Sequence, residues 1–375
     1  MKILVIGDPN SAYIDGYVKN VLKGNKIVLA SESARNENFC QSYIQNGCTF
    51  VALSDGPLMR IPGVKSMLGT KKLAKKLRKK YGEFDCIHIH GLNRFRGRLA
   101  AHLKTSHSRL AITVWGSELL RSSDRLLAEY KKYYNKADVI SFENNDMLEE
   151  FERVYQYQGT KRYAITRFGD ELLDALRNYP SKATEAFRLR YQITPDDIIV
   201  SVGYNRNPAH RHIDVIQQLV RLPEDVQKRM LLLLPMTYGP RDDAYLSALD
   251  DTIASFQGRA IKFEEYLSKE ELADILVNAE FFIHAQPTDA QSMTLMEYLF
   301  TNTIVINGSW LKYSILNDHD VFLITYDHFD QLPEVLCNAI EKREKYVSLA
   351  SLNREKIGKL FNWNSVRQQW LDLYQ

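Results

Sequence analysis

The sequence predicts an α/β protein built from two doubly wound parallel sheets. Short, nearly continuous apolar runs alternate with segments of helical spacing, which is the pattern of parallel strands buried on both faces. The alternation restarts after about residue 180, and 375 residues are too many for one ordinary core. Right-handed crossovers would give each half helices on both faces of its sheet. We therefore expect two Rossmann-like domains, each binding ligands outside the carboxyl ends of its strands.

The apolar runs give the strands in order. The expected strands of the first half cover residues 2–7, 26–30, 49–54, 86–91, 110–116 and 138–143. Those of the second half cover residues 197–203, 230–236, 260–265, 279–285, 303–308 and 321–326. The segment 177–197 between the halves is typical of a linker followed by an entry helix.

Composition narrows the function classes. Hydrophobic residues make up 45% and charged residues 25% of the chain, as in soluble globular proteins, and the net charge of +3 does not suit a nucleic-acid-binding chain. The start lacks a long apolar leader, and no apolar run approaches the roughly 20 residues of a membrane span. We expect a cytoplasmic protein. Four cysteines without metal-ligand spacing fit free thiols in a reducing compartment: Cys40, Cys48, Cys86 and Cys337.

Two carboxylates flank the start of a predicted helix in the second half. Asp289 lies in the loop after an apolar strand, and Glu297 lies inside the helix that follows. The free N–H groups and positive dipole end of a helix start attract phosphate, so a diphosphate there would have one carboxylate on either side. The alternative is that Asp289 caps the helix and Glu297 faces solvent. The residues expected at the helix start are Gln291, Ser292 and Met293.

The stretch "DAQSMTLMEYLFTNTIVI" resembles the E-x7-E segment of GT-B glycosyltransferases, in particular the retaining family four group. The resemblance implies that Asp289 lies beside the transferred sugar and that Glu297 binds the ribose of a nucleotide donor. Three departures are visible: the first acid is Asp rather than Glu, residues 290–292 replace a Gly-aromatic-Gly sequence, and residues 301–303 replace Gly-x-Pro.

The segment "SVGYNRNPAHRHIDVIQQL" resembles the strand, loop and helix that clamp the diphosphate in the same family. The cations available for this role are Arg206 and Arg211, since a guanidinium matches phosphate oxygens. Either arginine could instead cap the next helix or face solvent. Gly203, Asn205 and His212 are the other expected donor-binding residues of this segment.

First-domain loops resemble those that line the cleft opposite the donor. In "HIHGL" the resemblance implies that His90 approaches the transferred sugar, although a histidine at a strand end is more often structural. If the reaction inverts configuration, His90 or Glu118 could act as the base. The loop at 7–13 lacks G-x-G-x-x-G, which argues against a dinucleotide dehydrogenase. The expected acceptor or cleft residues are Asn10, Trp115, Gly116, Ser117 and Glu118.

The end of the chain, "FNWNSVRQQWLDLY", resembles the closing helix of the family, which crosses back onto the first domain. The expected architecture is therefore GT-B, with two domains facing across a cleft. We expect an acceptor-binding domain at 1–175, a nucleotide-sugar-binding domain at 176–357, and the closing helix at 358–375. Segment 263–268 is the expected base-binding stretch. Such an enzyme needs no metal, and we interpret "DHD" at 318–320 as a polar loop.

A basic stretch, residues 64–84, holds eight Lys or Arg between Lys65 and Lys80, with Met67, Leu68, Leu73 and Leu77 among them. This composition favours a helix lying on an anionic membrane, and Arg94, Arg96 and Arg98 extend the basic run. The alternative is a solvated helix whose leucines pack on its own sheet.

The function expected from these features is a glycosyltransferase that moves a sugar from a nucleotide donor to a glycan or lipid-linked acceptor in bacterial surface polysaccharide synthesis. No cofactor and no nucleic-acid partner are expected, and the protein could be peripheral on the inner face of the membrane. Two alternatives stay open: a non-catalytic GT-B partner subunit that binds nucleotide or glycan, and a nucleotide-sugar epimerase.

Overall fold

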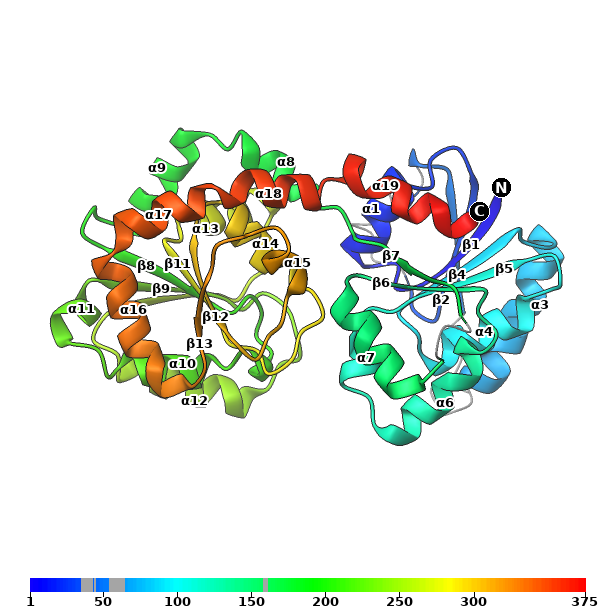
Figure 1. The fold of residues 1–375 in the computed structure, drawn as a ribbon, viewed down its shortest axis with the longest axis horizontal. Coiled ribbons are helices and arrows are strands. Elements are labelled where there is room, and N and C mark those ends of the chain that lie inside the picture. Colours follow the sequence, from blue (N-terminus) through cyan, green and yellow to red (C-terminus); the bar gives the residue numbers. More distant parts are fainter. Residues whose placement is uncertain (35–42, 44, 54–64, 158–160) are drawn as a thin grey trace. The chain divides into compact units, whose positions relative to one another are not determined.

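The chain forms two compact units in the computed structural model (Figure 1). The first contains Met1–Asp170 and Phe361–Gln375, and the second contains Glu171–Leu360. The structure describes residues 1–34, 43, 45–53, 65–157 and 161–375. Cys40 and the first residue of the basic stretch lie outside these ranges. The units divide at 170/171 and 360/361, whereas the sequence predicts domain boundaries at 175/176 and 357/358.

A parallel sheet organises the first unit. Within the described residues its order is β3-β2-β1-β4-β5-β6-β7, with the strand order reversing between β1 and β4. The strands are β1 (Lys2–Ile6), β2 (Lys26–Ser31), β3 (Cys48–Ala52), β4 (Cys86–His90), β5 (Arg109–Thr113), β6 (Val139–Phe142) and β7 (Tyr163–Ile165). The helices and short helical turns are α1 (Ala12–Asn20), η3 (Lys65–Gly69), α3 (Thr70–Tyr81), α4 (Arg94–Leu103), α5 (Ser117–Leu120), α6 (Asp124–Tyr134), α7 (Asn145–Tyr155), α19 (Trp363–Leu371) and η6 (Asp372–Tyr374).

The second unit repeats this topology. Its parallel sheet has the order β10-β9-β8-β11-β12-β13, again as far as the chain is described, and it reverses between β8 and β11. The strands are β8 (Ile198–Val202), β9 (Met230–Pro235), β10 (Arg259–Phe263), β11 (Phe281–His284), β12 (Ile304–Gly308) and β13 (Ile324–Tyr326). The helices and turns are α8 (Leu172–Arg177), α9 (Ser181–Arg190), η4 (Pro208–His210), α10 (His212–Leu219), α11 (Glu224–Lys228), α12 (Asp243–Ala254), α13 (Lys269–Asn278), α14 (Met293–Phe300), α15 (Ser314–Asn317), η5 (Phe329–Gln331), α16 (Leu332–Glu341), α17 (Arg343–Ser351) and α18 (Asn353–Leu360).

Successive side chains of the second sheet serve two separate cores. Val200 and Val202 of β8 pack with α10, α12 and α16 on one face, whereas Ile199 packs with α9 and α13 on the other. A sheet covered on both faces needs apolar side chains at every position, which is why its strands appear in the sequence as continuous apolar runs. The predicted doubly wound domains are confirmed.

The closing segment packs on the first unit, as expected (Figure 1). Trp363 of α19 lies against Gly16 of α1, where an added Cβ would meet the indole at 2.8 Å. The fully buried Trp370 donates from its indole nitrogen to the carbonyl of Arg167 at 2.6 Å. Tyr374 reaches the Nδ1 atom of His88 at 2.7 Å. Burial of this closing helix against α1 therefore joins the two ends of the described chain within one core.

Two elements differ from the prediction. The strand β7 was missed because its three residues are only partly buried and form no apolar run. The helix α3 buries Leu73 and Leu77 in the first unit, whereas Met67 and Leu68 before it are 60% and 57% exposed. The apolar residues of the basic stretch therefore do not form one stripe, and only Leu73 and Leu77 pack as the solvated-helix alternative expects.

Within the described parts of the chain, no helix is long and apolar enough to cross a membrane. Cys86 and Cys337 carry free thiols, and burial raises the pKa of Cys86 to about 12.

Candidate functional site

The two places where strand order reverses are where open α/β sheets bind ligands. In the second unit this position lies between the carboxyl ends of β8 and β11. The loop after β8 contains Gly203, Asn205 and Arg206, and the loop after β11 leads through Asp289 to α14. The topology therefore gathers the predicted donor-binding segments at neighbouring strand ends.

The loop after β8 turns tightly over the start of α10. Gly203 has a φ of +64°, and an added Cβ would meet Nε2 of His212 at 2.5 Å, so this position requires glycine on both grounds. His212 is fully buried, and its Nδ1 lies 2.9 Å from the hydroxyl of Tyr245. His212 is an expected donor-binding residue, and the structure places its imidazole in the core beneath Gly203 of this loop.

The two candidate arginines point to different neighbours. Arg206 donates through its guanidinium to the carbonyl of Thr237 at 3.0 Å, in the loop that follows β9. Arg211 instead forms an ion pair with Asp214 at 2.8 Å and stacks over the Phe329 ring, 4.0 Å from its centroid. Those contacts already occupy the Arg211 guanidinium, so Arg206 is the better placed of the two for a diphosphate at the strand ends.

Asn205 shapes the same loop. Its side-chain oxygen accepts from the backbone N–H of Asn207 at 2.9 Å, which closes a local turn. The side chain also hydrogen-bonds with Tyr238, a residue of the β9 loop. The predicted donor-binding role of Asn205 therefore competes with a local role in holding two loops together.

The start of α14 has the geometry predicted for it. Ser292 is the N-cap, and its hydroxyl accepts from the N–H of Leu295 at 3.1 Å. Gln291 is partly exposed immediately before the cap, and Met293 is buried in the first turn. The cap leaves the other first-turn N–H groups without partners inside the helix, as a phosphate site requires.

The two carboxylates both raise the pKa of one tyrosine, Tyr238. Asp289 is partly exposed, and Glu297 is 7% exposed in the second turn of α14. Burial raises the pKa of Tyr238, and the negative charges of Glu297 and Asp289 raise it further. Burial and the charge of Asp289 likewise raise the pKa of Tyr204. Glu297 is thus not the solvated face residue of the alternative interpretation.

Sequence reasoning missed several polar residues of this region. Gln286 donates to the hydroxyl of Tyr204 at 2.7 Å, and Tyr313 donates to Asp289 at 2.9 Å. The indole nitrogen of Trp310 donates to the carbonyl of Gln286 at 2.6 Å. Their position in the sequence could have identified them, because each of these residues follows shortly after the end of a predicted strand.

In the first unit, the strand order reverses between β1 and β4. Asn10 follows β1, where its amide donates to the carbonyl of Ala34 at 3.2 Å. Glu118 is buried, and its Oε1 accepts from the N–H groups of Leu92 at 3.0 Å and Trp115 at 2.9 Å. The carboxylate thereby joins the loops after β4 and β5, and burial raises its pKa. Gly116, at a φ of +101°, precedes the one-turn helix that Ser117 begins.

His90 is the last residue of β4, at the carboxyl end where it was predicted, and its side chain is buried. The imidazole is 0% exposed, and rings of Tyr17, Trp115, Phe168 and Trp370 surround it at centroid distances between 4.7 and 6.2 Å. Neither ring nitrogen has a hydrogen-bond partner among the described residues. Direct contact with a sugar, which the resemblance implied, therefore requires the covering rings to move.

Buried neutral histidines make stability depend on pH. Burial lowers the pKa of His88 in the first unit to about 3 and that of His212 in the second to about 4, both from 6.5. Between pH 6.5 and 5 the unfolded chain therefore binds protons that the folded chain does not, and acid favours unfolding. We expect the free energy of unfolding to fall by up to ~1.4 kcal/mol per pH unit for each histidine. Urea unfolding at pH 7, 6 and 5 measures this, and a flat profile would contradict it.

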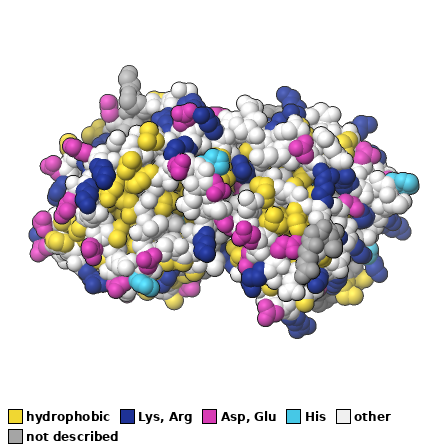
Figure 2. Space-filling view, viewed as in Figure 1, with side chains coloured by type: hydrophobic (Ala, Val, Ile, Leu, Met, Phe, Trp, Pro, Cys, Tyr) yellow, Lys and Arg dark blue, Asp and Glu magenta, His cyan; other side chains and the backbone are white. Residues whose placement is uncertain are grey.

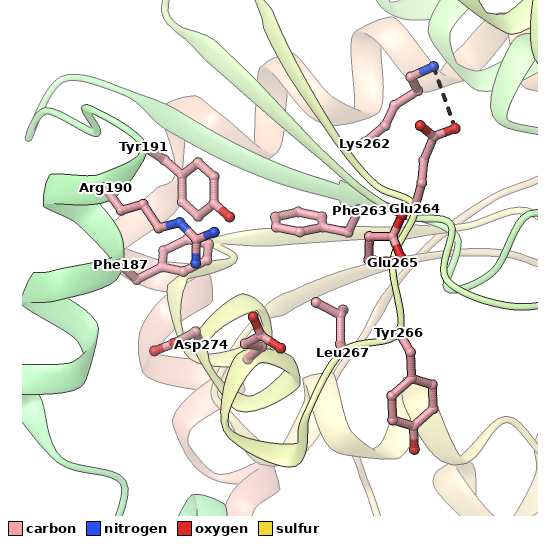
Figure 3. A pocket seen from close by; sticks show the side chains of 11 residues that line it. Phe187, Arg190, Tyr191, Lys262, Phe263, Glu264, Glu265, Tyr266, Leu267 and Asp274 are labelled. Atoms are coloured by element: carbon pink, nitrogen blue, oxygen red, sulfur yellow. Dashed lines mark ion pairs between the residues drawn. The ribbon is translucent and has the colours of Figure 1, made fainter.

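A cavity of about 200 Å³ lies elsewhere in the second unit, beside the expected base-binding segment (Figure 3). Aromatic rings of α9 and of the end of β10 line it together with four carboxylates, and Asp274 accepts from the hydroxyl of Tyr179 at 2.6 Å. The carboxylates would repel a diphosphate. The lining residues are Phe187, Arg190, Tyr191, Lys262, Phe263, Glu264, Glu265, Tyr266, Leu267, Glu271 and Asp274.

Among the described residues, no three His, Cys, Asp or Glu side chains are grouped as ligands of a metal ion would be. The exposed residues Asp318, His319 and Asp320 follow α15 directly.

Comparisons with known proteins agree with this geometry. Residues 2–144 match the model of the glycosyl transferase 4-like family. The whole chain is similar in structure to a glycosyltransferase from Rickettsia africae, with 12% identity, a TM-score of 0.76, and coverage of 100% of this chain and 97% of the other. For sucrose-phosphate synthase from Thermosynechococcus elongatus the identity is 16% and the TM-score 0.75, and the match covers 100% of this chain and 98% of the other. For Anabaena HepE, solved with UDP, the identity is 14% and the TM-score 0.76, and the match covers 99% of each chain. No curated protein matches the sequence.

The fold of the whole chain is therefore that of the GT-B glycosyltransferases, and the predicted resemblance to this class is confirmed. Within the class, the first domain is similar to the glycosyl transferase 4-like family.

Proposed function

We propose that this chain is a metal-independent glycosyltransferase that moves a sugar from a nucleoside diphosphate donor to a glycan or lipid-linked acceptor, with retention of configuration. The observation that carries the proposal is the pair Asp289 and Glu297 on either side of the α14 start, where the strand order of the second sheet reverses. That arrangement offers N–H groups to a diphosphate and a carboxylate to the hydroxyls at each of its ends.

Each residue then has a distinct role. The start of α14 and Arg206 neutralise the diphosphate as the glycosidic bond breaks, and fixed dipoles and a guanidinium do this without a metal. Glu297 accepts from the two ribose hydroxyls. Asp289 accepts from hydroxyls of the transferred sugar and holds its anomeric carbon in place for attack.

UDP-glucose is the first donor to test, because HepE has also been solved with it, at 12% identity and a TM-score of 0.75. A thermal-shift panel of UDP, GDP, TDP, ADP and CDP on the wild type and on Glu297→Ala tests the proposal. We expect one nucleotide to raise the melting temperature of the wild type and to lose most of this effect in the variant. If no nucleotide stabilises the wild type, the nucleotide-sugar assignment is wrong.

For the acceptor we propose a lipid-linked glycan at the cytoplasmic face of a membrane in bacterial surface polysaccharide synthesis, bound with the help of α3. The exposed face of α3 carries cations without an acid among them, and the exposed Met67 and Leu68 lie directly before it. Anionic lipids attract such a face by ~1 kcal/mol for each cation close to the surface. Arg94 and Arg98 pair with Glu129, and Arg96 pairs with Glu32, so these three arginines contribute little. The exposed cations of α3 are Lys71, Lys72, Lys75, Lys76, Arg78, Lys79 and Lys80.

Co-sedimentation with vesicles that contain phosphatidylglycerol tests this surface. We expect the wild type to bind at low salt and to be released as salt rises, because exposed charges are screened. The variant with Lys71, Lys72, Lys75 and Lys76 changed to Gln should bind at least tenfold more weakly. The control variant loses the same number of charges at exposed positions outside α3. In it, glutamine replaces Lys228, Lys342, Lys345 and Lys359. Equal loss in both variants would mean that α3 is no specific membrane surface.

We propose no nucleic-acid partner. Lys, Arg, Asp and Glu side chains are interspersed over the described part of the face that Figure 2 shows, and the seven exposed cations of α3 lie on a single helix. A duplex would require a continuous basic surface.

A further inference from the structure

The carboxylate of Asp289 is held on both of its oxygens. Oδ1 accepts from the N–H of Ala290 at 2.9 Å, and Oδ2 accepts from the hydroxyl of Tyr313 at 2.9 Å. Tyr313 comes from a different segment, between β12 and α15, and its side chain is 4% exposed. A buried group from the neighbouring strand end therefore fixes the direction of a partly exposed carboxylate.

Tyr313 in turn lies against a hydrogen-bonded group of His284, Asn307 and Gln286. The ring of His284 stacks on it at a centroid distance of 6.3 Å and an angle of 26°. Nδ1 of His284 lies 3.0 Å from the side-chain oxygen of Asn307, and its Nε2 lies 3.2 Å from the amide nitrogen of Gln286. An amide oxygen only accepts and an amide nitrogen only donates, so the proton of this imidazole lies on Nδ1. His284 is therefore neutral, and each ring nitrogen has a partner.

The hydroxyl of Tyr313 is the donor of its bond to Asp289. Burial raises the pKa of its hydroxyl well above the ordinary value, and the charge of Asp289 raises it further. The hydroxyl thus keeps its proton at neutral pH. A hydrogen bond to a carboxylate is stronger than one between neutral groups, so it can select one rotamer of Asp289.

We propose that Tyr313 is a positioning residue that aims the carboxylate of Asp289 at the transferred sugar, an inference that rests on the proposed function. Asp289 is one methylene shorter than the glutamate that the family pattern has at this position, and loop side chains are free to change rotamer. The bond from Tyr313 removes that freedom before the donor binds. The Tyr313 hydroxyl should therefore affect binding of the sugar part of the donor and leave binding of the nucleotide part unchanged.

The test is Tyr313→Phe, which removes only the hydroxyl. We expect kcat to fall about ten- to a hundredfold, because a misaimed group loses rate without losing the fold. Affinity for UDP should stay within about twofold, whereas affinity for UDP-glucose should fall toward that for UDP. If the thermal-shift panel selects another base, the corresponding nucleotide and nucleotide sugar replace these probes.

A matched control is Tyr179→Phe. Its hydroxyl donates to Asp274 at 2.6 Å in the same unit, so it removes the same kind of bond from another aspartate. This variant should keep the wild-type kcat. Calorimetry on Asp289→Asn and on the double variant separates positioning from general structural loss: Tyr313→Phe should change UDP-glucose affinity in the wild type but not further in Asp289→Asn.

The outcomes are distinct. An active wild type with unchanged kcat in Tyr313→Phe would overturn the inference alone, as would independent losses in the double variant. A wild type that binds no nucleotide would overturn the proposed function and this inference together. A drop in UDP affinity equal to that in UDP-glucose affinity would also overturn it, because it would reveal general damage to the site.

Discussion

Replacing Asp289 with asparagine should lower kcat by about 100-fold or more while leaving the fold and the affinity for the bare nucleotide nearly unchanged. The side chains are almost equal in size, so the packing around Tyr313 and Ala290 is kept, while the bond from Tyr313 loses its charged acceptor. In the proposed reaction, Asp289 supplies a negative charge beside the sugar, where positive charge develops as the glycosidic bond breaks. Removing one such preorganised group typically costs 10²- to 10³-fold in rate. Steady-state transfer assays with the donor selected by the nucleotide panel measure the change.

A matched control is Asp318→Asn, which removes the same charge from an exposed position after α15 in the same unit. We expect it to retain wild-type kcat, and this variant also tests the interpretation of residues 318–320 as a polar loop. If Asp289→Asn were as active as Asp318→Asn, Asp289 would not act on the sugar. The helix-start geometry would then support nucleotide binding only, as in the non-catalytic alternative.

The fold was predictable because burial on both sheet faces leaves a signal in consecutive residues. The run at 230–236 is apolar at every position, since β9 lies inside its sheet between β8 and β10. The same physics explains the miss at β7, an edge strand whose residues are only partly buried. An edge strand needs no continuous apolar run, so its pattern does not stand out from that of a loop.

Predictions of the site were less complete, because spacing places a residue in a loop but does not direct its side chain. The two arginines of the β8 loop were equivalent in sequence, yet Arg211 pairs with Asp214 of its own helix and only the fold brings Phe329 beneath it. His90 lies at a strand end and His212 at a helix start, and both side chains are buried. Tyr313 contacts Asp289 across 24 residues, a distance over which no local pattern exists.

This separation of the arginines has a measurable consequence. Arg206→Ala should weaken binding of the nucleoside diphosphate by about ten- to a hundredfold, since a charged hydrogen bond contributes about 1.5–3 kcal/mol. The affinity of Arg206→Lys for the nucleoside diphosphate should lie between those of the wild type and Arg206→Ala. The lysine ammonium keeps the charge but loses the fork that matches phosphate oxygens. Isothermal titration at two salt concentrations measures both effects, and the salt dependence of the wild type should be reduced in Arg206→Ala.

Arg211→Ala is the control for Arg206→Ala. It should leave nucleotide affinity within about twofold and lower the free energy of unfolding by about 0.5–1 kcal/mol, through loss of the Asp214 pair and of the stack on Phe329. The opposite result, with binding lost in Arg211→Ala and kept in Arg206→Ala, would mean that the ion pair with Asp214 opens when a donor arrives. The diphosphate would then lie toward the start of α10, and Asp289 and Glu297 would no longer flank it.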